Sequence, residues 1–592
     1  MPPAGARIRV MAERAGWQRV PSVSAGARGL WPNRYDFAVF VIVLGAFAAA
    51  AAGLAQMARP ITQLQANPVV LEVARLPGYA LQTTLRMLAA MAASLVFTFI
   101  VATLAARSRR AELVIVPALD ILQSVPVLGF LSFTVTFFVG LFPTSQLGPE
   151  LAAIFAIFTS QAWNMAFSFY QSLKTVPADL EEVARHFRLS AWQRFWRLDA
   201  PFAVPGLVWN AMMSMSGGWF FVVASEAISV GDTTVTLPGI GSWIALAIDR
   251  RDIGAVMQAV GAMLLVILLY DQLLFRPIVA WSEKFRMEQT ATQARARSWV
   301  LDLVRRSRLV ARLGALFARL VALPGALPMP ARRGFGRAAP NAARVRLLDR
   351  IWQVVVAAAT IWAGWMIFAY ARDALGPADL ADAVLGGLAT LARVLVLIVL
   401  ASLVWVPVGI WIGLRPRLAQ AIQPLAQFLA AFPANLLFPI LVVLIARYRL
   451  DPDIWLSPLM VLGTQWYILF NVIAGASVFP GDLREAAAIA GVRGWLWWRK
   501  VALPGVFPYF VTGALTAWGG SWNASIVAEV ASWGTTRLEA RGLGAYIANA
   551  TAAGDFHRVV LGIAVMAGFV IVFNRLLWRR LYRVAEARLR MG

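Results

Sequence analysis

The sequence predicts an all-α membrane protein in which about 12 transmembrane helices form two tandem, homologous six-helix halves. Three observations predict it: an apolar composition, hydrophobic runs of membrane-spanning length, and an internal repeat. Of the 592 residues, 60% are hydrophobic and 14% are charged, whereas soluble domains carry roughly a quarter charged residues. The mean hydropathy is +0.68. Because backbone groups in lipid must bond within their own segment, these runs are expected to be helices.

The internal repeat fixes the division into halves. Segment 117–126 aligns with 424–433, each with prolines nine positions apart, and the charged segment 179–201 aligns with 482–504. The earlier pairs share an offset of 307 and the later pairs an offset of 303. The first copy should therefore hold four extra residues, which we expect in the loop around 142–150. Several matches in one register indicate a duplication within the gene.

The apolar runs define the expected spans. In the first half they are 37–57, 84–105, 114–141, 151–172, 204–228 and 255–275. In the second half they are 351–371, 384–412, 422–446, 455–477, 506–531 and 558–578.

Arginine distribution predicts the topology. Arginines are dense in the loops of one side, which the positive-inside rule assigns to the cytoplasm together with both termini and both repeated charged segments. The expected divisions are a cytoplasmic tail (1–35), a first half (36–286, core 80–286), a basic linker (287–350) and a second half (351–592, core 387–590). The tail is too long and polar for a signal peptide. Helical spacing of apolar residues between arginines in the linker favours a helix in the headgroup layer, with a partly ordered tether as the alternative.

Composition also limits the chemistry. A net charge of +24 would suggest nucleic acid in a soluble protein. Here the arginines flank hydrophobic segments, which favours membrane lipid as the partner and no nucleic acid. The chain has no cysteine, which excludes disulfides, thiol catalysis and cysteine metal sites, and its two histidines leave little for a histidine-based metal centre. No catalytic residues are assigned. None of its three lysines follows a glycine, so a phosphate-binding P-loop is absent.

The repeated charged segments are expected to form short helices followed by a turn. Asp179 and Asp482 are candidate N-caps. Gly491 can adopt the left-handed conformation that ends a helix. The first copy has Arg188 at that position, where a left-handed backbone costs about 1 kcal/mol, so a redrawn turn and unequal docking remain open. The final proline of each segment stands where the next span should begin.

This pattern resembles the cytoplasmic coupling motif of permeases in binding-protein-dependent ABC importers of type I. The resemblance covers roughly residues 80–286 and 387–590. The second copy fits the motif fully, whereas the first fits by position and departs at Val183, Arg188 and Ala200. The residues that the resemblance assigns to ATPase coupling are Glu182, Val183, Ala184, Arg188, Pro201, Glu485, Ala486, Ala487, Gly491, Leu503 and Pro504.

The resemblance implies a transport subunit of the bacterial inner membrane that is not itself an enzyme. Its expected partners are two cytoplasmic ATP-binding cassette subunits, which would bind ATP and Mg²⁺, and a periplasmic or extracellular solute-binding protein. No cofactor is expected in this chain. The segment 542–546 is similar to permeases of the nitrate, sulfonate and taurine branch. The implied cargo is a small nitrate-, sulfonate- or bicarbonate-like anion.

Polar residues inside the expected spans are candidates for the pathway or its gate. Glu226 and Glu529 occupy matching positions, and intramembrane acids are costly enough to suggest a function. The alternative is a carboxylate paired with a nearby arginine or backbone group. Arg86 and Arg393 also match, and each either adds positive potential to the route or reaches the membrane surface. The remaining candidates, which alternatively serve close helix packing, are Ser214, Ser216, Trp219, Trp522 and Asn523.

Other classes fit less well. An ion-gradient-driven secondary transporter with duplicated halves is the main alternative. It has no need for paired coupling motifs, and its repeats are often inverted, whereas six spans per half give parallel repeats. A membrane-embedded enzyme is the third possibility, weakened by the missing cysteines and the two unclustered histidines.

Overall fold

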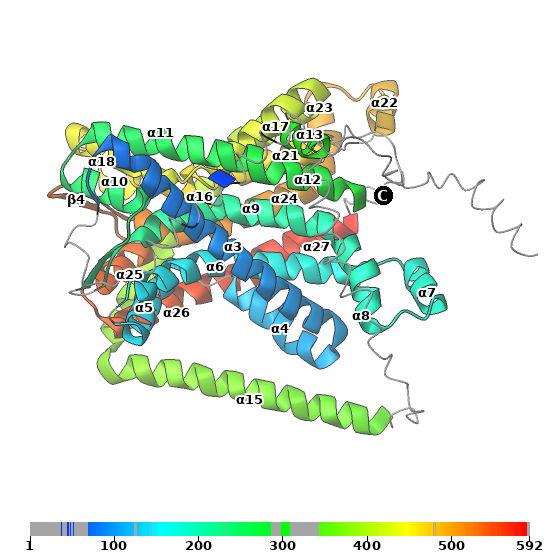
Figure 1. The fold of residues 1–592 in the computed structure, drawn as a ribbon, viewed down its shortest axis with the longest axis horizontal. Coiled ribbons are helices and arrows are strands. Elements are labelled where there is room, and N and C mark those ends of the chain that lie inside the picture. Colours follow the sequence, from blue (N-terminus) through cyan, green and yellow to red (C-terminus); the bar gives the residue numbers. More distant parts are fainter. Residues whose placement is uncertain are drawn as a thin grey trace, which may run out of the picture.

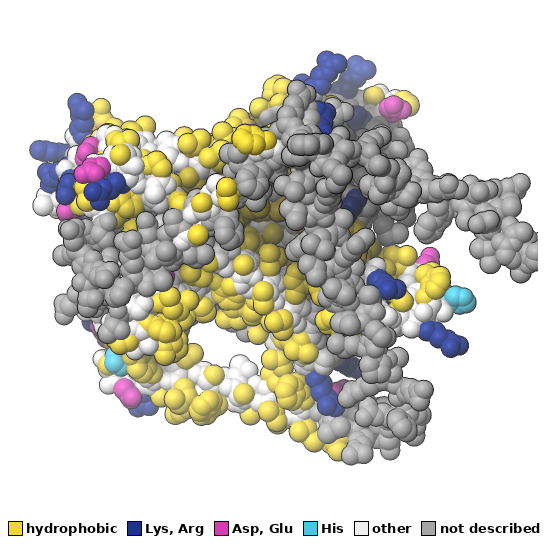
Figure 2. All heavy atoms as spheres, viewed as in Figure 1, with side chains coloured by type: hydrophobic (Ala, Val, Ile, Leu, Met, Phe, Trp, Pro, Cys, Tyr) yellow, Lys and Arg dark blue, Asp and Glu magenta, His cyan; other side chains and the backbone are white. Residues whose placement is uncertain are grey.

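The computed structural model describes residues 69–123, 127–143, 145–230, 233–285, 298–307, 342–477 and 481–588, with a few single residues besides. Helices run side by side along the long axis of the molecule (Figure 1). Hydrophobic side chains cover the middle of the visible face, and charged side chains gather toward its two ends (Figure 2). This is the distribution of a bundle that spans a membrane.

The described part of the first half is mainly helical. Its helices include η2 (Val73–Arg75), α3 (Leu76–Arg107), α4 (Arg109–Leu122), α5 (Val127–Leu141), α6 (Leu147–Lys174), α7 (Ala178–His186), α8 (Ala191–Arg194), α9 (Ala200–Glu226), α10 (Ile240–Asp249) and α11 (Ile253–Tyr270). A π-helical segment, η3 (Phe195–Asp199), joins α8 to α9. A second one, η4 (Asp271–Phe275), joins α11 to α12 (Arg276–Ser282), which η5 (Glu283–Phe285) extends.

The second half repeats this order. Its helices are α15 (Ala342–Ala374), α16 (Pro377–Gly413), α17 (Pro416–Ala431), η6 (Ala434–Leu437), α18 (Phe438–Tyr448), α19 (Pro452–Trp455), α20 (Ser457–Leu462), α21 (Gln465–Ser477), α22 (Gly481–Ile489), α23 (Gly494–Trp497), η7 (Trp498–Ala502), α24 (Leu503–Ala528), α25 (Leu543–Ala552), α26 (Phe556–Phe573), η8 (Asn574–Trp578) and α27 (Arg579–Arg588). Of the linker, α13 (Trp299–Arg306) is described, and α15 begins inside the range expected for the linker.

The described spans agree with the predicted ones. Eight helices of the described part are long and apolar enough to cross a membrane, or ten when two bent helix pairs are each counted as one span. The pairs are 416–431 with 434–448, bent by 75°, and 452–462 with 465–477, bent by 41°. Of the two other predicted spans, 37–57 lies almost entirely outside the described residues. The other, 114–141, is described as α4 and α5 on either side of 124–126.

Two short antiparallel hairpins were not predicted. β1 (Ala227–Val230) pairs with β2 (Thr233–Thr236), and β3 (Val530–Trp533) pairs with β4 (Thr536–Glu539). The predicted spans 204–228 and 506–531 therefore end in strands rather than helix. The two hairpins are related by the offset of 303, so they belong to the repeat. The four extra residues of the first copy do lie between α5 and α6, where the offset changes from 307 to 303.

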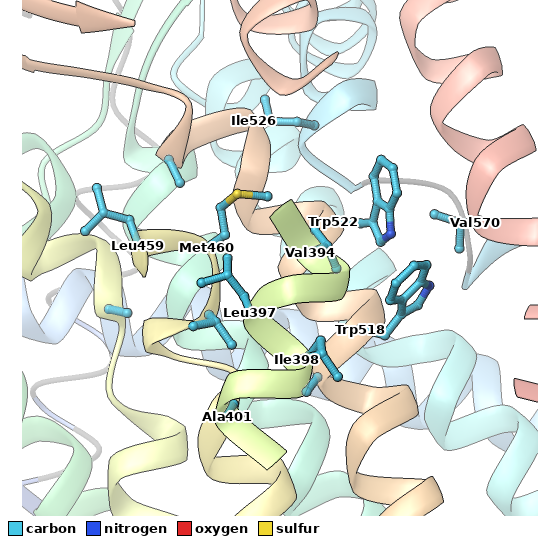
Figure 3. Packing of buried hydrophobic residues seen from close by; sticks show 14 of the residues in the cluster. Val394, Leu397, Ile398, Ala401, Leu459, Met460, Trp518, Trp522, Ile526 and Val570 are labelled. Atoms are coloured by element: carbon cyan, nitrogen blue, oxygen red, sulfur yellow. The ribbon is translucent and has the colours of Figure 1, made fainter. Parts of the chain in front are cut away.

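Each half has its own apolar core, and each core takes residues from the other half. In the second half, α16 contributes Val394 and Ile398 on the side of the tryptophans of α24, and Leu397 on the side of Met460 (Figure 3). Across the halves, the rings of Trp209 and Phe470 stack with centroids 5.5 Å apart. The two cores therefore meet in one interface along α9, α17 and α21.

Helix α15 lies at the periphery. None of its most apolar 18-residue window is buried, and Figure 2 shows an opening between this helix and the bundle. Polar and aromatic contacts hold both ends. At one end Arg110 pairs with Asp349 at 3.2 Å, and at the other the rings of Tyr370 and His557 stack at 4.3 Å.

Candidate functional site

The two repeated charged segments protrude from the same end of the molecule (Figure 1). We call them the docking segments. The first consists of α7, α8 and η3, and the second of α22, α23 and η7. A shared position at one end is what a pair of surfaces for soluble partners requires.

The turn after the first helix has the same geometry in both copies. Gly491 has φ 68°, as expected, and Arg188 has φ 49°. In the first copy Leu189 N–H donates to Ala184 O at 3.1 Å, and in the second Val492 N–H donates to the matching carbonyl at 2.9 Å. Both are the six-residue bond of the Schellman motif. The turn is therefore not redrawn at Arg188, and the first copy bears a strain of about 1 kcal/mol.

The predicted N-cap role of Asp179 is wrong. Helix α7 begins at Ala178 and its N-cap position is Pro177, so Asp179 lies in the first turn. There the carboxylate still faces the positive end of the helix dipole. Helix α22 likewise begins at Gly481, before Asp482.

The docking segments expose large apolar side chains. Phe187 is 71% exposed, Ile489 is 88% exposed and Trp495 is 75% exposed. The motif acids Glu182 and Glu485 are exposed beside them. Ala184, 4% exposed, and its counterpart Ala487, 7% exposed, face the segment's own interior. The residues Val183 and Ala486 are exposed.

A π-helical segment joins each docking segment to the following span. In η3 the Ala200 N–H donates to Phe195 O, and in η7 the Leu503 N–H donates to Trp498 O. Pro201 and Pro504 then occupy the first turn of α9 and α24, as predicted. Each docking segment is thus continuous, through helical backbone, with a membrane span.

The opposite end of the first half contains a buried ion cluster around Arg86. The Arg86 side chain is fully buried and binds Glu150 through Nε at 2.6 Å and Nη2 at 2.7 Å. Its Nη1 binds Glu226 at 2.7 Å. Thr83 Oγ1 donates to the same Glu226 oxygen at 2.7 Å, and the backbone N–H of Gly241 donates to the other at 2.7 Å. The excess negative charge lies at the N-terminus of α10, where the helix dipole favours it.

The second half repeats this cluster around Arg393. Its Nη2 binds Asp453 at 2.7 Å and its Nη1 binds Glu529 at 3.2 Å. Thr390 Oγ1 donates to Glu529 at 2.7 Å, and the backbone N–H of Ala545 donates to it at 3.0 Å. The sequence prediction missed the second acid of each cluster and its threonine. The signal was present, because Glu150 and Asp453 share the offset of 303 and the threonines share 307.

These contacts show where the candidate arginines and acids lie in this conformation. Arg86 does not reach the membrane surface, since its side chain is 0% exposed. Glu226 and Glu529, 0% and 1% exposed, are each bound by an arginine, a threonine and a backbone amide. In this conformation Glu226 therefore fastens the end of α9 and the start of α10 to α3, and Glu529 fastens the end of α24 and the start of α25 to α16.

The remaining pathway candidates lie on α9 and α24. Asn523 joins the halves, because its Oδ1 accepts from the Val127 N–H at 2.7 Å. Ser214, Trp219 and Trp522 are buried, and Ser216 Oγ donates to Met212 O at 3.0 Å within its own helix. These residues therefore lie in packed positions on the two helices.

Only Ser216 and Trp219 of the candidates border a small cavity between α9, α11, η4 and α17. Its lining is Met212, Met215, Ser216, Trp219, Ile267, Tyr270, Asp271, Phe275, Gln427, Phe428 and Ala431. At the matching place in the second half, Trp518 packs against Trp578 and Phe573. Met215 and Phe275 stand where those tryptophans would be, so the cavity follows from smaller side chains in the first half.

The fold and these sites define a multi-pass membrane protein with two homologous halves and two docking segments at one end. The sequence pattern of the family described as binding-protein-dependent transport system inner membrane component matches residues 94–275 and 405–591. The chain belongs to this family and carries its domain twice.

Several curated relatives are permeases named for the transport of nitrate, bicarbonate or taurine. The chain is 29% identical over 188 residues to the nitrate import permease protein NrtB of Leptolyngbya laminosa, covering 32% of this chain and 64% of that protein. It is 28% identical over 188 residues to the bicarbonate transport system permease protein CmpB of Synechococcus elongatus, with the same coverage. It is 28% identical over 215 residues to the taurine transport system permease protein TauC of Escherichia coli, covering 35% and 73%. The chain thus spans less than two thirds of the first relatives' length.

Proposed function

We propose that this chain is the transmembrane permease of an ATP-driven importer and supplies both membrane halves in one polypeptide. Each docking segment would sit in a groove of a cytoplasmic ATP-binding subunit, and a solute-binding protein would deliver cargo to the opposite end. The observation that carries this is the repeated docking segment. Two copies with the same turn, at the same end of the molecule, expose large apolar side chains that a partner could cover.

The same arrangement suggests how movement of the ATP-binding subunits would be transmitted to the membrane spans. Each docking segment continues into α9 or α24 without an intervening loop. Movement of the two ATP-binding subunits toward each other would displace both spans together. Since both spans border the interface between the halves, this would alternate the access of the pathway.

We propose a small anion as the cargo, because the relatives' names specify nitrate, bicarbonate or taurine transport. The proposed route follows α9 and α24, with Ser214, Ser216, Trp219, Trp522 and Asn523 as its candidate lining. Competition among nitrate, bicarbonate and the sulfonate taurine, measured as uptake into proteoliposomes with the cognate binding protein, identifies the cargo. Uptake of none of the three would contradict the proposed cargo class.

The coupling proposal is tested by charge reversal of the exposed motif acids. Glu485→Arg and Glu182→Arg should each lower ATP-driven uptake at least tenfold, since a buried like-charge contact costs several kcal/mol. ATPase stimulation by the binding protein should fall in parallel. Asp373→Arg is the matched control, because it reverses an exposed acid on a helix end away from the docking segments. Undiminished uptake in both docking variants would refute the coupling role.

A further inference from the structure

The first docking segment is fastened to the membrane bundle by a chain of charged side chains. Asp199 of η3 accepts from Arg107, at the end of α3, at 3.1 Å, and from Arg194 of α8 at 3.3 Å. Arg194 also binds Glu181 of α7 at 2.5 Å. We call this chain of four residues, Arg107–Asp199–Arg194–Glu181, the ionic strap. It connects the helix that would meet the ATPase to the ends of two membrane spans.

Burial makes Asp199 the centre of the strap. Its side chain is 9% exposed, whereas those of Arg107, Arg194 and Glu181 are 37%, 32% and 37% exposed. Arg107 is also held in place by the ring of Phe195, whose centroid lies 5.4 Å from its guanidinium carbon. A buried carboxylate between two arginines constrains both side chains. When either arginine leaves, the carboxylate loses part of the positive charge that compensates its burial.

The residues that form the strap are replaced in the second docking segment. At the matching positions stand Leu414, Ala502 and Trp497, and Arg484 replaces the acid. Ala502 belongs to the apolar core cluster of the second half, and Leu414 and Trp497 pack against that cluster. The two copies therefore share a backbone path and a turn but join the bundle by different forces, ionic in one and apolar in the other.

We propose that Asp199, through Arg107 and Arg194, is a positioning residue for the first docking segment, so that α7, α3 and α9 move as one unit. The inference rests on the proposed coupling function. It explains the expected difference in docking between the two segments by the contacts that join each segment to the membrane bundle, since their turns have the same geometry. Ionic attachment between partly exposed groups is weakened by salt, whereas apolar packing is not.

The test compares amide hydrogen exchange of the full-length chain in nanodiscs. With Asp199→Asn, which removes the charge at constant volume, amides of α7 should exchange about fivefold faster, while those of α22 stay unchanged. Asp199→Glu should restore slow exchange. Arg197→Gln removes an exposed cation of the same π-helical segment outside the strap and should leave α7 unchanged. Unchanged exchange in α7, or an equal rise in α22, would overturn the proposal.

A second measurement addresses coupling, with the ATP-binding subunits, ATP and Mg²⁺ added. In the unaltered complex ATP should change exchange in α7, in the first turns of α9 and in the last turn of α3, around 104–107. In Asp199→Asn the responses of α7 and α9 should remain, because helical backbone joins them, and that of α3 should disappear. An undiminished α3 response would overturn the role of Asp199. Absence of any ATP response in the unaltered complex would count against the proposed function instead, while the comparison on the chain alone would still decide the strap.

Discussion

Arg86 binds two carboxylates in the first half. All three side chains are buried, so that water does not hydrate the carboxylates in place of the arginine. Removing a single partner from such a buried cluster leaves uncompensated charge, which costs far more than the cluster itself contributes. The matching Arg393 is 14% exposed and its partner Asp453 is 44% exposed. The two clusters have the same connectivity but differ in how much water can relieve a broken contact.

We predict that Arg86→Met destabilises the protein by about 3–5 kcal/mol, because it strands Glu150 and Glu226. The same substitution at Arg393 should cost about 1–2 kcal/mol, since Asp453 can be hydrated. Thermal melts of the detergent-solubilised protein, followed by size exclusion, measure both. Equal losses at the two sites would contradict this role for burial.

At the scale of elements, the repeat extends to irregular backbone. The π-helical segments η3 and η7 differ by 303 residues, as do η4 and η8. Such segments are rare and frequently occur at functional sites. Helix α15 is the opposite case, a regular helix whose contacts with the bundle, among the described residues, lie at its two ends. Its position rests on few contacts and can be checked directly.

We predict that α15 is held near α26 at the Tyr370 end. The chain has no cysteine, so introduced pairs react without background. Tyr370→Cys with His557→Cys should cross-link with a short bismaleimide in native membranes, because the two rings stack. Trp362→Cys with His557→Cys is the control and should not cross-link, since Trp362 lies about 12 Å from Tyr370 along the same helix. Equal yields would contradict the described position of α15.

At the scale of the whole molecule, hydrogen bonds and stacked rings join the halves. Asn523 accepts from Val127, and Asn435 donates to Phe220 O at 3.2 Å. The halves therefore associate through their own surfaces, although they belong to one chain.

We predict that the halves associate without the linker. Residues 1–307 and 342–592, expressed as separate chains, should co-purify, and Asn523→Leu should weaken this by about 1–3 kcal/mol because the Val127 N–H loses its acceptor. Thr512→Val is the control, since its hydroxyl bonds within its own helix. Co-purification that is lost in the unaltered pair, or equal in both variants, would contradict this interface.

Much of the architecture could be predicted because most elements of one half have a counterpart at a fixed offset in the other half. Each predicted element could therefore be compared with a second stretch of sequence. The register located the spans, the docking segments and the loop with four extra residues. The hairpins were missed because Ala227–Val230 continues an apolar run and carries no strand alternation of its own. Glu150 was missed because its partner Arg86 is 64 positions away, and only the fold brings them together. The turn at Arg188 was left open because local propensity opposes the left-handed backbone that the surrounding helix ends impose.

The ionic strap has a consequence for how such a protein can change over generations. In an assembly of two identical chains every substitution is inherited twice, so any alteration of one attachment also alters the other. Here the two halves are different stretches of one chain, and the strap lies in the first of them. One docking segment could therefore acquire a charged attachment while its sister retained an apolar one. The duplication gave selection two independent parts on which to act.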